Sequence, residues 1–366
     1  MSIEKTNLSE VSQLEKNNSK FNDEKNGKEF IDINNIDIKR LSNISNINEI
    51  IKEKKPEISE KLEILEFNGS GSECAVYKAK VKNCNKFVIM KIILRKEGQL
   101  NINEINISKR VKHPNIIDFY YYSNIIENKL DCIILEYMKF GNLRDFQKNL
   151  IKRKCFSESL LCFLGYQILN ALYYCHKCKI AHLDLKPQNI VINEYLELKL
   201  IDFSISLDYS NIKTKKIQLK CKGTRFYMPP EILSSEKINI SDLNKVDLFS
   251  LGVILYNFAF GKYPFNLKPE DYGGSQDFIK IKKKIDIETL EIEPNEYYSI
   301  DFVDLVKKLL EKDIRKRINI FDAINHKWIQ SAKILLEEKE KMSNTGNFLL
   351  YLLTDHLKNF NAINYY

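Results

Sequence analysis

One short stretch limits what this chain can fold into more than any other. Residues 182–189 read His-Leu-Asp-Leu-Lys-Pro-Gln-Asn, and a second acid, Asp202, opens an Asp-Phe-Ser triplet further on. A hydroxyl that attacks a polyphosphate needs a carboxylate to take its proton, cations to hold the phosphates and oxygen ligands to hold those cations. Asp184, Lys186, Asn189 and Asp202 can supply these groups. The spacing therefore predicts the chemistry of phosphoryl transfer.

The residues on either side of this stretch strengthen that interpretation. Apolar runs at 189–193 and 198–202 predict two short strands around a turn. A chance match of the pattern in an ordinary loop would not need such flanks. They therefore favour the chemical interpretation over chance.

The stretch resembles the catalytic loop of the eukaryotic protein kinases, which reads H-R-D-x-K-x-x-N, and the triplet resembles their metal-binding D-F-G. Two letters differ, because Leu183 stands where that family usually has arginine and Ser204 where it usually has glycine. The resemblance covers about residues 60–330. It implies an α+β fold with two lobes, a small β-rich N-lobe and a larger helical C-lobe.

The composition of the chain is compatible with a globular enzyme of two lobes. With 366 residues, of which 44% are hydrophobic, the chain can bury a core in each of two lobes. The net charge of +8 comes from 57 basic and 49 acidic residues that are interspersed, and no nucleic-acid-binding motif accompanies it. We therefore expect no nucleic-acid partner, and the oligomeric state stays open.

The sequence also predicts a reducing compartment, and we assign the protein to the cytoplasm. It shows no secretory leader and no apolar stretch of about 20 residues, the length of a membrane span, and Ser2 excludes N-myristoylation. The eight cysteines lie in apolar segments and are expected to be free thiols. Cys175 and Cys178 resemble half of a zinc or redox site. Because no second pair follows at a suitable spacing, we expect core residues there.

Three regions are predicted along the chain. Residues 1–56 are rich in Asn, Lys, Glu and Ser and are expected to be a largely disordered extension, with one candidate helix at 36–54. Residues 57–330 form the predicted kinase domain. Residues 331–366 form a helical tail, whose apolar part at 348–357 can dock on the kinase or on a partner.

Hydrophobic periodicity changes within the predicted domain, from that of strands in the N-lobe (57–138) to that of helices in the C-lobe (139–330). In the C-lobe we expect Ser157 to cap a long helix. The predicted N-lobe strands lie at 62–67, 75–81 and 87–94, with a fourth ending at 136 and a helix at 101–111. The strongest helical periods beyond the capped helix lie at 246–260 and 302–310.

The turn after the first strand predicts a phosphate-binding loop. Glycine lets a backbone approach phosphates closely because it carries no side chain. The family's loop has three glycines, and this chain has Cys74 at the third position. The resemblance implies ATP contacts at Gly69, Ser70, Gly71, Ser72 and Val76.

The same resemblance implies the rest of the nucleotide site. Lys91 corresponds to the lysine that holds the α- and β-phosphates, and Glu104, in preference to Glu97, to the helix glutamate that holds this lysine. Ile89 replaces the small residue that usually covers the adenine, so the pocket is tighter or the base sits differently. The remaining implied contacts are Glu136 and Met138 at the hinge, Val191, Asn189 and Asp202.

The implied reaction moves the γ-phosphoryl group of ATP to a protein hydroxyl. Asp184 would deprotonate the hydroxyl, Lys186 would neutralise charge on the γ-phosphate, and Asn189 and Asp202 would bind Mg²⁺. Lys186 and Thr224 lie where the serine/threonine branch of the family has a lysine and a threonine. The expected function is thus that of a protein serine/threonine kinase with ATP and Mg²⁺.

Features of the predicted C-lobe agree with the resemblance to the protein kinases. Glu231 ends the implied activation segment, residues 247–252 begin the implied central helix, and Arg317 is the expected buried partner of Glu231. Because Leu183 removes an arginine that grips a loop phosphate in many relatives, we expect activity not to depend on loop phosphorylation in the usual way. Ser204 leaves the metal ligand in place and suggests altered loop dynamics.

Substrate preference is only partly constrained. Asn142 and Gln188 lie where kinases that prefer basic substrates often carry acids, so arginine-directed specificity is not expected. Five lysines lie between 213 and 222. They can contact an acidic substrate or simply face solvent, and the second interpretation is the simpler one.

Two alternatives stay open. The departures at Cys74, Ile89, Leu183 and Ser204 would suit a pseudokinase scaffold that binds nucleotide or partners with little catalysis. The intact polar residues of the catalytic loop argue against it. A kinase of small molecules or lipids is the other alternative, which the complete segment 223–231, suited to presenting a polypeptide, disfavours.

Overall fold

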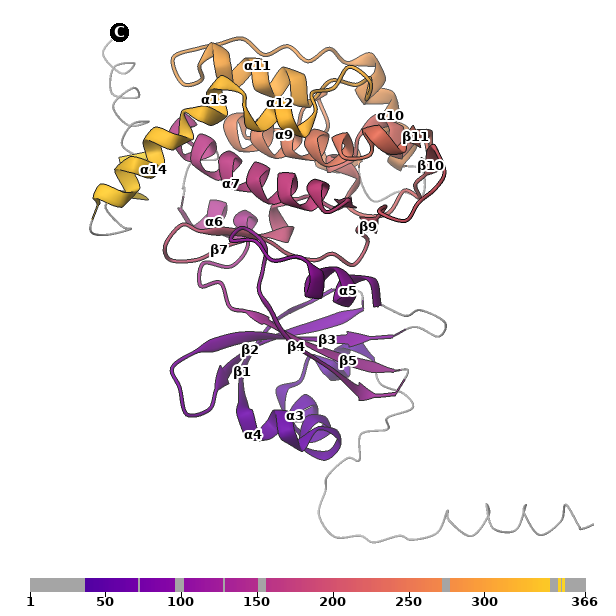
Figure 1. Cartoon of the computed structure of the whole chain (residues 1–366), viewed down its shortest axis with the longest axis vertical. Helices are drawn as coiled ribbons and strands as arrows, with labels where there is room; N and C mark the ends of the chain where they lie inside the picture. The colour runs from indigo at the N-terminus through magenta and orange to yellow at the C-terminus, as the bar shows by residue number, and fades with distance from the viewer. Residues whose placement is uncertain are drawn as a thin grey trace, which may run out of the picture.

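The computed structural model describes residues 37–71, 73–95, 102–127, 129–150, 156–271, 277–342, 348–349 and 351–352. They form a small lobe built on one sheet and a larger lobe of helices, stacked one on the other (Figure 1). The two-lobed α+β fold predicted from the sequence is therefore confirmed.

The N-lobe is an antiparallel sheet in the order β1-β2-β3-β5-β4. The three predicted strands and the one ending at residue 136 are all present, and the helix expected at 101–111 is α5 (Ile102–Arg110). The strands are β1 (Leu62–Ser70), β2 (Cys74–Val81), β3 (Phe87–Leu94), β4 (Phe119–Ile126) and β5 (Leu130–Glu136).

Alternation along β3 decides which side chains face the other lobe. Successive residues of a strand point to opposite faces. Val88, Met90 and Ile92 belong to the apolar cluster on the outer face of the sheet. Ile89 and Lys91 therefore point to the opposite face, toward the C-lobe.

Three short helices cover that outer face, on the side of the sheet away from the C-lobe (Figure 1). They are α2 (Ile38–Leu41), α3 (Ile44–Lys54) and α4 (Pro56–Lys61). Leu41, Ile47 and Ile51 are buried in one cluster with the strand residues. Within the candidate helix at 36–54, the described residues form α2 and α3. The disorder expected for the rest of the extension is wrong for residues 37–56, because a narrow apolar stripe was hidden in a polar composition; residues 1–36 lie outside the described residues.

The C-lobe is built around two helices, α7 (Glu158–Lys177) and α9 (Lys245–Phe260). Ser157 caps α7 as predicted, because its hydroxyl oxygen accepts a hydrogen bond from the Leu160 amide at 3.3 Å. α9 is buried on nearly every side, as expected of a helix that is apolar all round. The other C-lobe helices are α6 (Leu143–Leu150), α8 (Pro230–Leu233), α10 (Asp277–Ile287), α11 (Ile300–Leu309), α12 (Ile320–Ile324), α13 (Lys327–Gln330) and α14 (Ala332–Lys341).

Short strand pairs tie the loops of the C-lobe together. β7 (Ile190–Ile192) pairs with β8 (Leu198–Leu200), which confirms the two strands predicted around a turn. β6 (Ile180–Ala181) pairs with β9 (Leu207–Asp208). β10 (Lys216–Gln218) pairs with β11 (Lys237–Asn239).

The described part of the C-terminal tail packs on the C-lobe. α14 lies against α7, and Phe348 and Leu352 are completely buried. The Phe348 ring meets the Phe163 ring of α7 with centroids 5.1 Å apart, and the Leu352 carbonyl accepts a hydrogen bond from Ser157. The sequence allowed the tail to dock either on the kinase domain or on a partner, and these residues dock on the kinase domain of the same chain.

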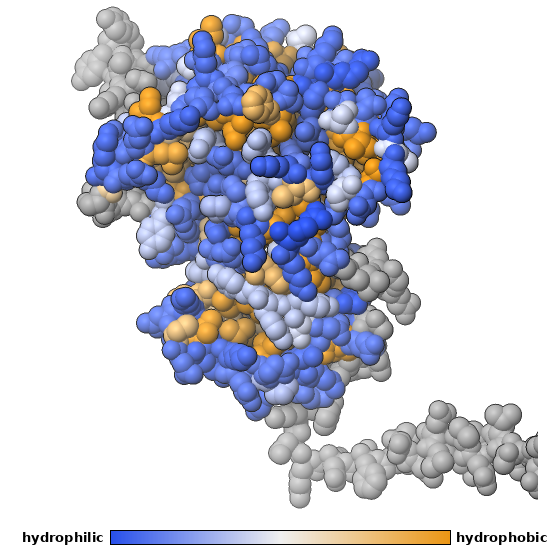
Figure 2. Space-filling view, viewed as in Figure 1, coloured by the Kyte–Doolittle hydropathy of each residue, from blue (hydrophilic) through white to orange (hydrophobic). Residues whose placement is uncertain are grey.

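The surface is mostly hydrophilic on the face shown in Figure 2, with hydrophobic residues in short, scattered patches. Within the described ranges, no helix has the length and apolar character needed to cross a membrane.

Candidate functional site

A pocket of about 230 Å³ lies between the lobes. Of the expected nucleotide contacts, five line it: Val76, Ile89, Glu136, Met138 and Val191. Gly69, Ser70 and Gly71 lie in or just after β1 and do not line it, while Ser72 lies outside the described residues. The sequence interpretation missed Asn68, Ile117, Leu135 and Ile201, which line the pocket as ordinary apolar or turn positions without a recognisable motif.

The end of β5 offers the pocket mainly backbone groups. The Glu136 side chain pairs with Lys199 at 2.7 Å, and its amide donates to the Asp118 carbonyl at 3.0 Å. Its carbonyl and the backbone of Met138 are therefore what this hinge can present to a flat heterocycle. Ile89 faces the same space from β3, and whether it tightens the pocket or shifts the base stays a prediction.

Lys91 connects the two lobes. Its Nζ lies 2.7 Å from Glu104 Oε1 on α5 and 3.4 Å from Asp202 Oδ1. Burial alone would lower the pKa of Lys91, but the charges of Glu104 and Asp202 outweigh it and raise the pKa. The lysine is therefore a fixed cation, and the pairing expected with Glu104 is present; Glu97 lies outside the described residues.

Asp202 is held as a carboxylate. Burial alone would raise its pKa, but the charge of Lys91 and a hydrogen bond from the Ser204 side chain lower it to about 2. Ser204 therefore does more than replace a glycine, because its hydroxyl stabilises the charged form of Asp202. That contact was not foreseen, since the sequence showed only a lost glycine.

Asp184 collects three hydrogen-bond donors. Its Oδ2 accepts from Lys186 Nζ at 2.6 Å and from Asn189 Nδ2 at 3.0 Å, and its Oδ1 accepts from the Thr224 amide at 3.1 Å. Since the Asn189 amide nitrogen is used on Asp184, its side-chain oxygen is left to face another ligand. The structure therefore brings together the catalytic-loop residues that the sequence singled out.

Asp247, which the sequence interpretation placed only at the start of the central helix, is a buried acid that holds this loop in place. Asp247 Oδ2 accepts from the His182 amide at 2.9 Å, and its Oδ1 accepts from the Leu183 amide at 2.8 Å. Leu183 has a φ of 65°, a left-handed conformation that costs a leucine roughly 1–2 kcal/mol. The two bonds to Asp247 offset that cost. The available signal was an acid in the first turn of an otherwise apolar helix.

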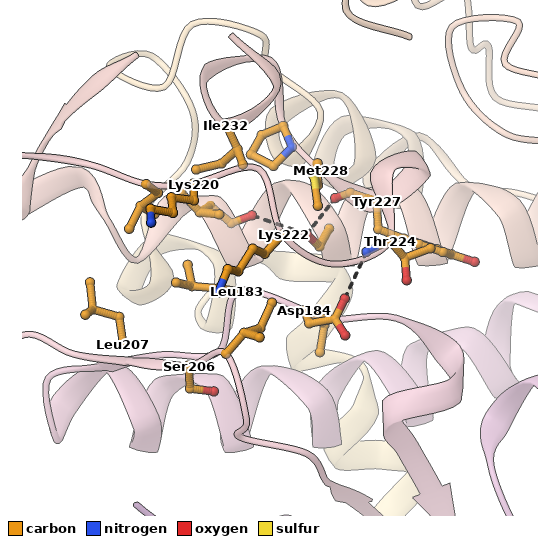
Figure 3. A pocket seen from close by; sticks show the side chains of 16 residues that line it. Leu183, Asp184, Ser206, Leu207, Lys220, Lys222, Thr224, Tyr227, Met228 and Ile232 are labelled. Atoms are coloured by element: carbon orange, nitrogen blue, oxygen red, sulfur yellow. Dashed lines mark hydrogen bonds between the residues drawn. The ribbon is translucent and has the colours of Figure 1, made fainter. Parts of the chain in front are cut away.

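The activation segment closes over Asp184. Figure 3 shows Thr224 beside Asp184 and Tyr227 near the wall of a small cavity of about 190 Å³. Leu183, Leu207 and Ile232 line this cavity from three different parts of the chain. A leucine thus lines this cavity, together with other apolar side chains, where the family usually has an arginine.

Gly223 is the tightest point of this contact. It has a φ of 103°, and a Cβ there would lie 2.7 Å from Asp184 Oδ1. We expect Gly223→Ala to displace the segment and lower kcat by at least about tenfold, because strain of about 1–3 kcal/mol would fall on the contact with the Asp184 carboxylate. Gly141→Ala is the control, since Gly141 also has a positive φ but nothing within 4 Å of its Cβ position. Equal kcat values for the two variants would contradict the expectation.

The expected pair of Glu231 and Arg317 is present and buried. Arg317 Nη1 and Nη2 lie 2.7 and 3.0 Å from the two Glu231 oxygens. Its remaining donors reach the carbonyls of Glu311 and Lys245, and its guanidinium lies over the Phe249 ring. This arginine therefore joins the end of the activation segment to α9 and the loop after α11.

Neither cysteine chemistry nor a protein-only metal cage is apparent in the described part of the chain. The described cysteines are free, and Cys175 is buried in the core as expected. His176 Nε2 bonds Asp247 at 2.8 Å, so it is used in packing. No group of three His, Cys, Asp or Glu side chains among the described residues could hold a metal ion. Any Mg²⁺ here would need substrate oxygens besides Asn189 and Asp202.

Comparison with known proteins agrees with this geometry. The protein kinase domain family model matches residues 62–329. The chain is 31% identical over 268 residues to serine/threonine-protein kinase Aurora-1 of Arabidopsis thaliana, covering 71% of this chain and 83% of the relative. It is 32% identical over 284 residues to Aurora/IPL1-related protein kinase 2 of Caenorhabditis elegans, covering 75% and 85%. It is 33% identical over 273 residues to human serine/threonine-protein kinase ULK3, covering 71% and 53%.

The fold has two lobes, a lysine–glutamate pair in the N-lobe whose lysine reaches Asp202 of the C-lobe, and a carboxylate that gathers lysine, asparagine and backbone donors. Together these features define a phosphoryl-transfer enzyme of the kinase class. With the family match over residues 62–329, the chain belongs to the protein kinase family.

Proposed function

We propose that this protein transfers the γ-phosphoryl group of ATP to serine or threonine hydroxyls of proteins, with Mg²⁺. The observation that carries the proposal is the convergence of Lys186, Asn189 and the Thr224 amide on the Asp184 carboxylate. A base held in this way is oriented before the substrate arrives, which is where much of the rate advantage of an enzyme comes from. The names of the relatives, which are serine/threonine kinases, support the acceptor type.

The residues present fit Mg-ATP. Asp202 is ionised at neutral pH, and the free side-chain oxygen of Asn189 adds a second hard ligand. Bound Mg²⁺ would neutralise phosphate charge as it develops. Lys91, fixed by Glu104, would hold the α- and β-phosphates, and the apolar wall formed by Val76, Ile89 and Val191 would enclose the base.

The chain's own groups then account for the transfer. Asp184 would accept the proton of the attacking hydroxyl on its carboxylate, whose Oδ1 carries one hydrogen bond and whose Oδ2 carries two. Lys186, 2.6 Å from that carboxylate, would place its ammonium beside the γ-phosphate. The hydroxyl oxygen forms the new bond to phosphorus as the bond to the β-phosphate oxygen breaks, and ADP leaves.

The experiment is transfer of labelled phosphate from Mg-ATP to a panel of proteins, followed by hydrolysis to identify the labelled amino acid. Asp184→Asn is the blank. Label on phosphoserine or phosphothreonine above the blank supports the proposal. Label on glycerol or inositol headgroups alone would contradict it, and nucleotide binding without any transfer would favour the pseudokinase scaffold.

Leu183 stands where many relatives have an arginine that grips a phosphate on the activation segment. In this proposal activity therefore does not require phosphorylation of that segment. The activation segment is held by the bond from Thr224 to Asp184, by the pairing of β10 with β11, and by apolar packing around the cavity of Figure 3. None of these contacts needs a phosphate. We therefore expect the double variant Ser210→Ala, Thr214→Ala to keep at least about half of kcat/KM.

The measurement is kcat/KM on one protein substrate before and after phosphatase treatment, for the variant and the unchanged chain. All four values should agree within about twofold. A variant that keeps its melting temperature yet loses activity more than about tenfold would show that a phosphate on this loop is needed.

A further inference from the structure

A cationic groove lies on the C-lobe, beside the proposed active site. It has a volume of about 600 Å³ and runs between α6, the end of α9 and the loop that follows α9. Four of its lining side chains are cations: Arg144, Lys148, Lys262 and Lys268. We call these residues with the space between them the basic groove.

The charge of the basic groove is largely uncompensated. Arg144 donates a hydrogen bond to the neutral Gln147, and Lys262 lies within 4 Å of no carboxylate among the described residues. Lys148 pairs with Asp145 at 3.2 Å, but both side chains are more than half exposed. Asp271 pairs with Lys284 at 2.6 Å, and it also accepts a hydrogen bond from the Lys268 amide at 2.8 Å, so it offsets part of the charge of Lys268. The groove therefore favours a negatively charged occupant.

The groove is joined directly to the segment that contacts Asp184. Tyr263, on its wall, packs against Phe226 with ring centroids 4.8 Å apart, and its hydroxyl lies 3.4 Å from that of Tyr227. Burial raises the pKa of Tyr227, and the nearby charge of Arg144 opposes that rise. Because Phe226 and Tyr227 follow Thr224 closely, an occupant of the groove would continue toward Asp184.

A second cationic stretch lies on the other side of Thr224. Residues 209–224 contain five lysines, at 213, 215, 216, 220 and 222, and no acid. Lys220 and Lys222 line the cavity next to Asp184, and all five lysines are exposed. Two sets of cations thus lie near Asp184, the lysines that precede Thr224 and the basic groove that contacts the residues following it.

We propose that the basic groove and the lysines of 213–222 bind acidic side chains of the protein substrate, so that this kinase selects hydroxyls flanked by Asp, Glu or phosphorylated residues. The inference rests on the proposed function and specifies its substrate class. A peptide is favoured over a polynucleotide or a lipid surface because the groove is concave, carries the neutral Asn257 and Gln147 among its cations, and leads to a hydroxyl-activating carboxylate. Opposite charge across such a surface raises the association rate and favours the correct partner.

The test uses peptides with one central serine flanked on both sides by glutamate, glutamine or lysine. With the full chain we expect kcat/KM for the glutamate peptide to exceed that for the glutamine peptide by at least about tenfold, mainly through KM. The advantage should shrink as salt is added, because exposed charges are screened. Preference for the lysine peptide, or equal values for the three, would overturn the inference.

The variant Lys262→Glu, Lys268→Glu removes two exposed cations of the groove. It should raise KM for the glutamate peptide about tenfold and leave kcat nearly unchanged. The matched control, Lys327→Glu with Lys333→Glu, makes the same change of charge on α13 and α14 at exposed lysines that line neither the groove nor the nucleotide pocket. Equal effects of the two double variants would mean that only net charge matters, which would overturn the inference that the basic groove binds the substrate.

A binding measurement separates this inference from the proposed function. Fluorescence anisotropy of the labelled glutamate peptide reports docking even in a chain that transfers no phosphate. Binding that the groove variant weakens and the control does not would support the groove whatever the transfer assay shows. Stronger competition by a polynucleotide or by anionic lipid vesicles than by the unlabelled glutamate peptide would assign the surface to another partner and overturn the inference.

Discussion

Asp184→Asn is expected to lower the rate of phosphoryl transfer by about 10²- to 10⁴-fold, the usual contribution of a positioned general base. The amide cannot take a proton, and it must also turn one N–H toward the donors that the carboxylate now accepts from Lys186, Asn189 and Thr224. The loss should therefore fall on kcat. The KM for ATP should change little, because Asp184 does not line the nucleotide pocket.

Steady-state kinetics at saturating ATP would measure this loss, and a thermal shift with Mg-ATP would check that nucleotide still binds. Asp286→Asn is the control, because Asp286 is an exposed acid whose side chain bonds only the neighbouring Lys282 among the described residues. Activity within about tenfold of the unchanged chain would show that another group takes the proton.

Arg317→Met should lower the free energy of unfolding by about 3–5 kcal/mol. The change leaves the Glu231 carboxylate buried without its cation, and it removes the donors that now reach the carbonyls of Glu311 and Lys245. A buried acceptor without a donor costs far more than an exposed one. The destabilisation should centre on the C-lobe, where all of these groups lie.

The single tryptophan of the chain gives a direct readout of that lobe. Trp328 is buried, with its ring against Phe302 and its Nε1 donating to Glu158 at 2.8 Å. Its fluorescence in urea at pH 7 should show an earlier midpoint for Arg317→Met. Arg315→Met is the control, since Arg315 pairs with Asp313 at the surface and little change is expected.

A double-mutant cycle would separate the pair from its surroundings. Adding Glu231→Leu to Arg317→Met removes the stranded carboxylate, so the double variant should be less destabilised than the sum of the single changes. Simple additivity would mean that Glu231 and Arg317 do not depend on each other, against the two short contacts between them.

The catalytic loop was predictable because its chemistry is local in sequence. Asp184, Lys186 and Asn189 lie within six residues, and their mutual contacts follow from one tight loop between β6 and β7. Lys91 and Glu104 were found through the kinase resemblance, and a 2.7 Å contact joins them. Strands and helices with strong periods were likewise found near their observed ends.

What the sequence did not predict depends on contacts between distant segments or on the exact conformation of a loop. Asp247 bonds amides some 65 residues away, and the hydrogen bond from Ser204 to Asp202 depends on the turn of that loop. The candidate helix at 36–54 covers α2 and α3, but the packing of α2 to α4 on the sheet was not predicted, for a different reason. Their polar, Asn- and Lys-rich composition is typical of disorder, and only the sheet face beneath them makes a few isoleucines enough to fold them.

Those helices matter for anyone who trims the protein to its family boundaries. A fragment that starts at residue 62, where the family match begins, would lack the side chains that cover Tyr77, Met90 and Ile92. The uncovered face would form a continuous apolar patch, the kind of surface that drives aggregation. The smallest piece that behaves as a well-folded kinase should therefore start near Asp37, and insolubility of a shorter one would say nothing about the catalytic site.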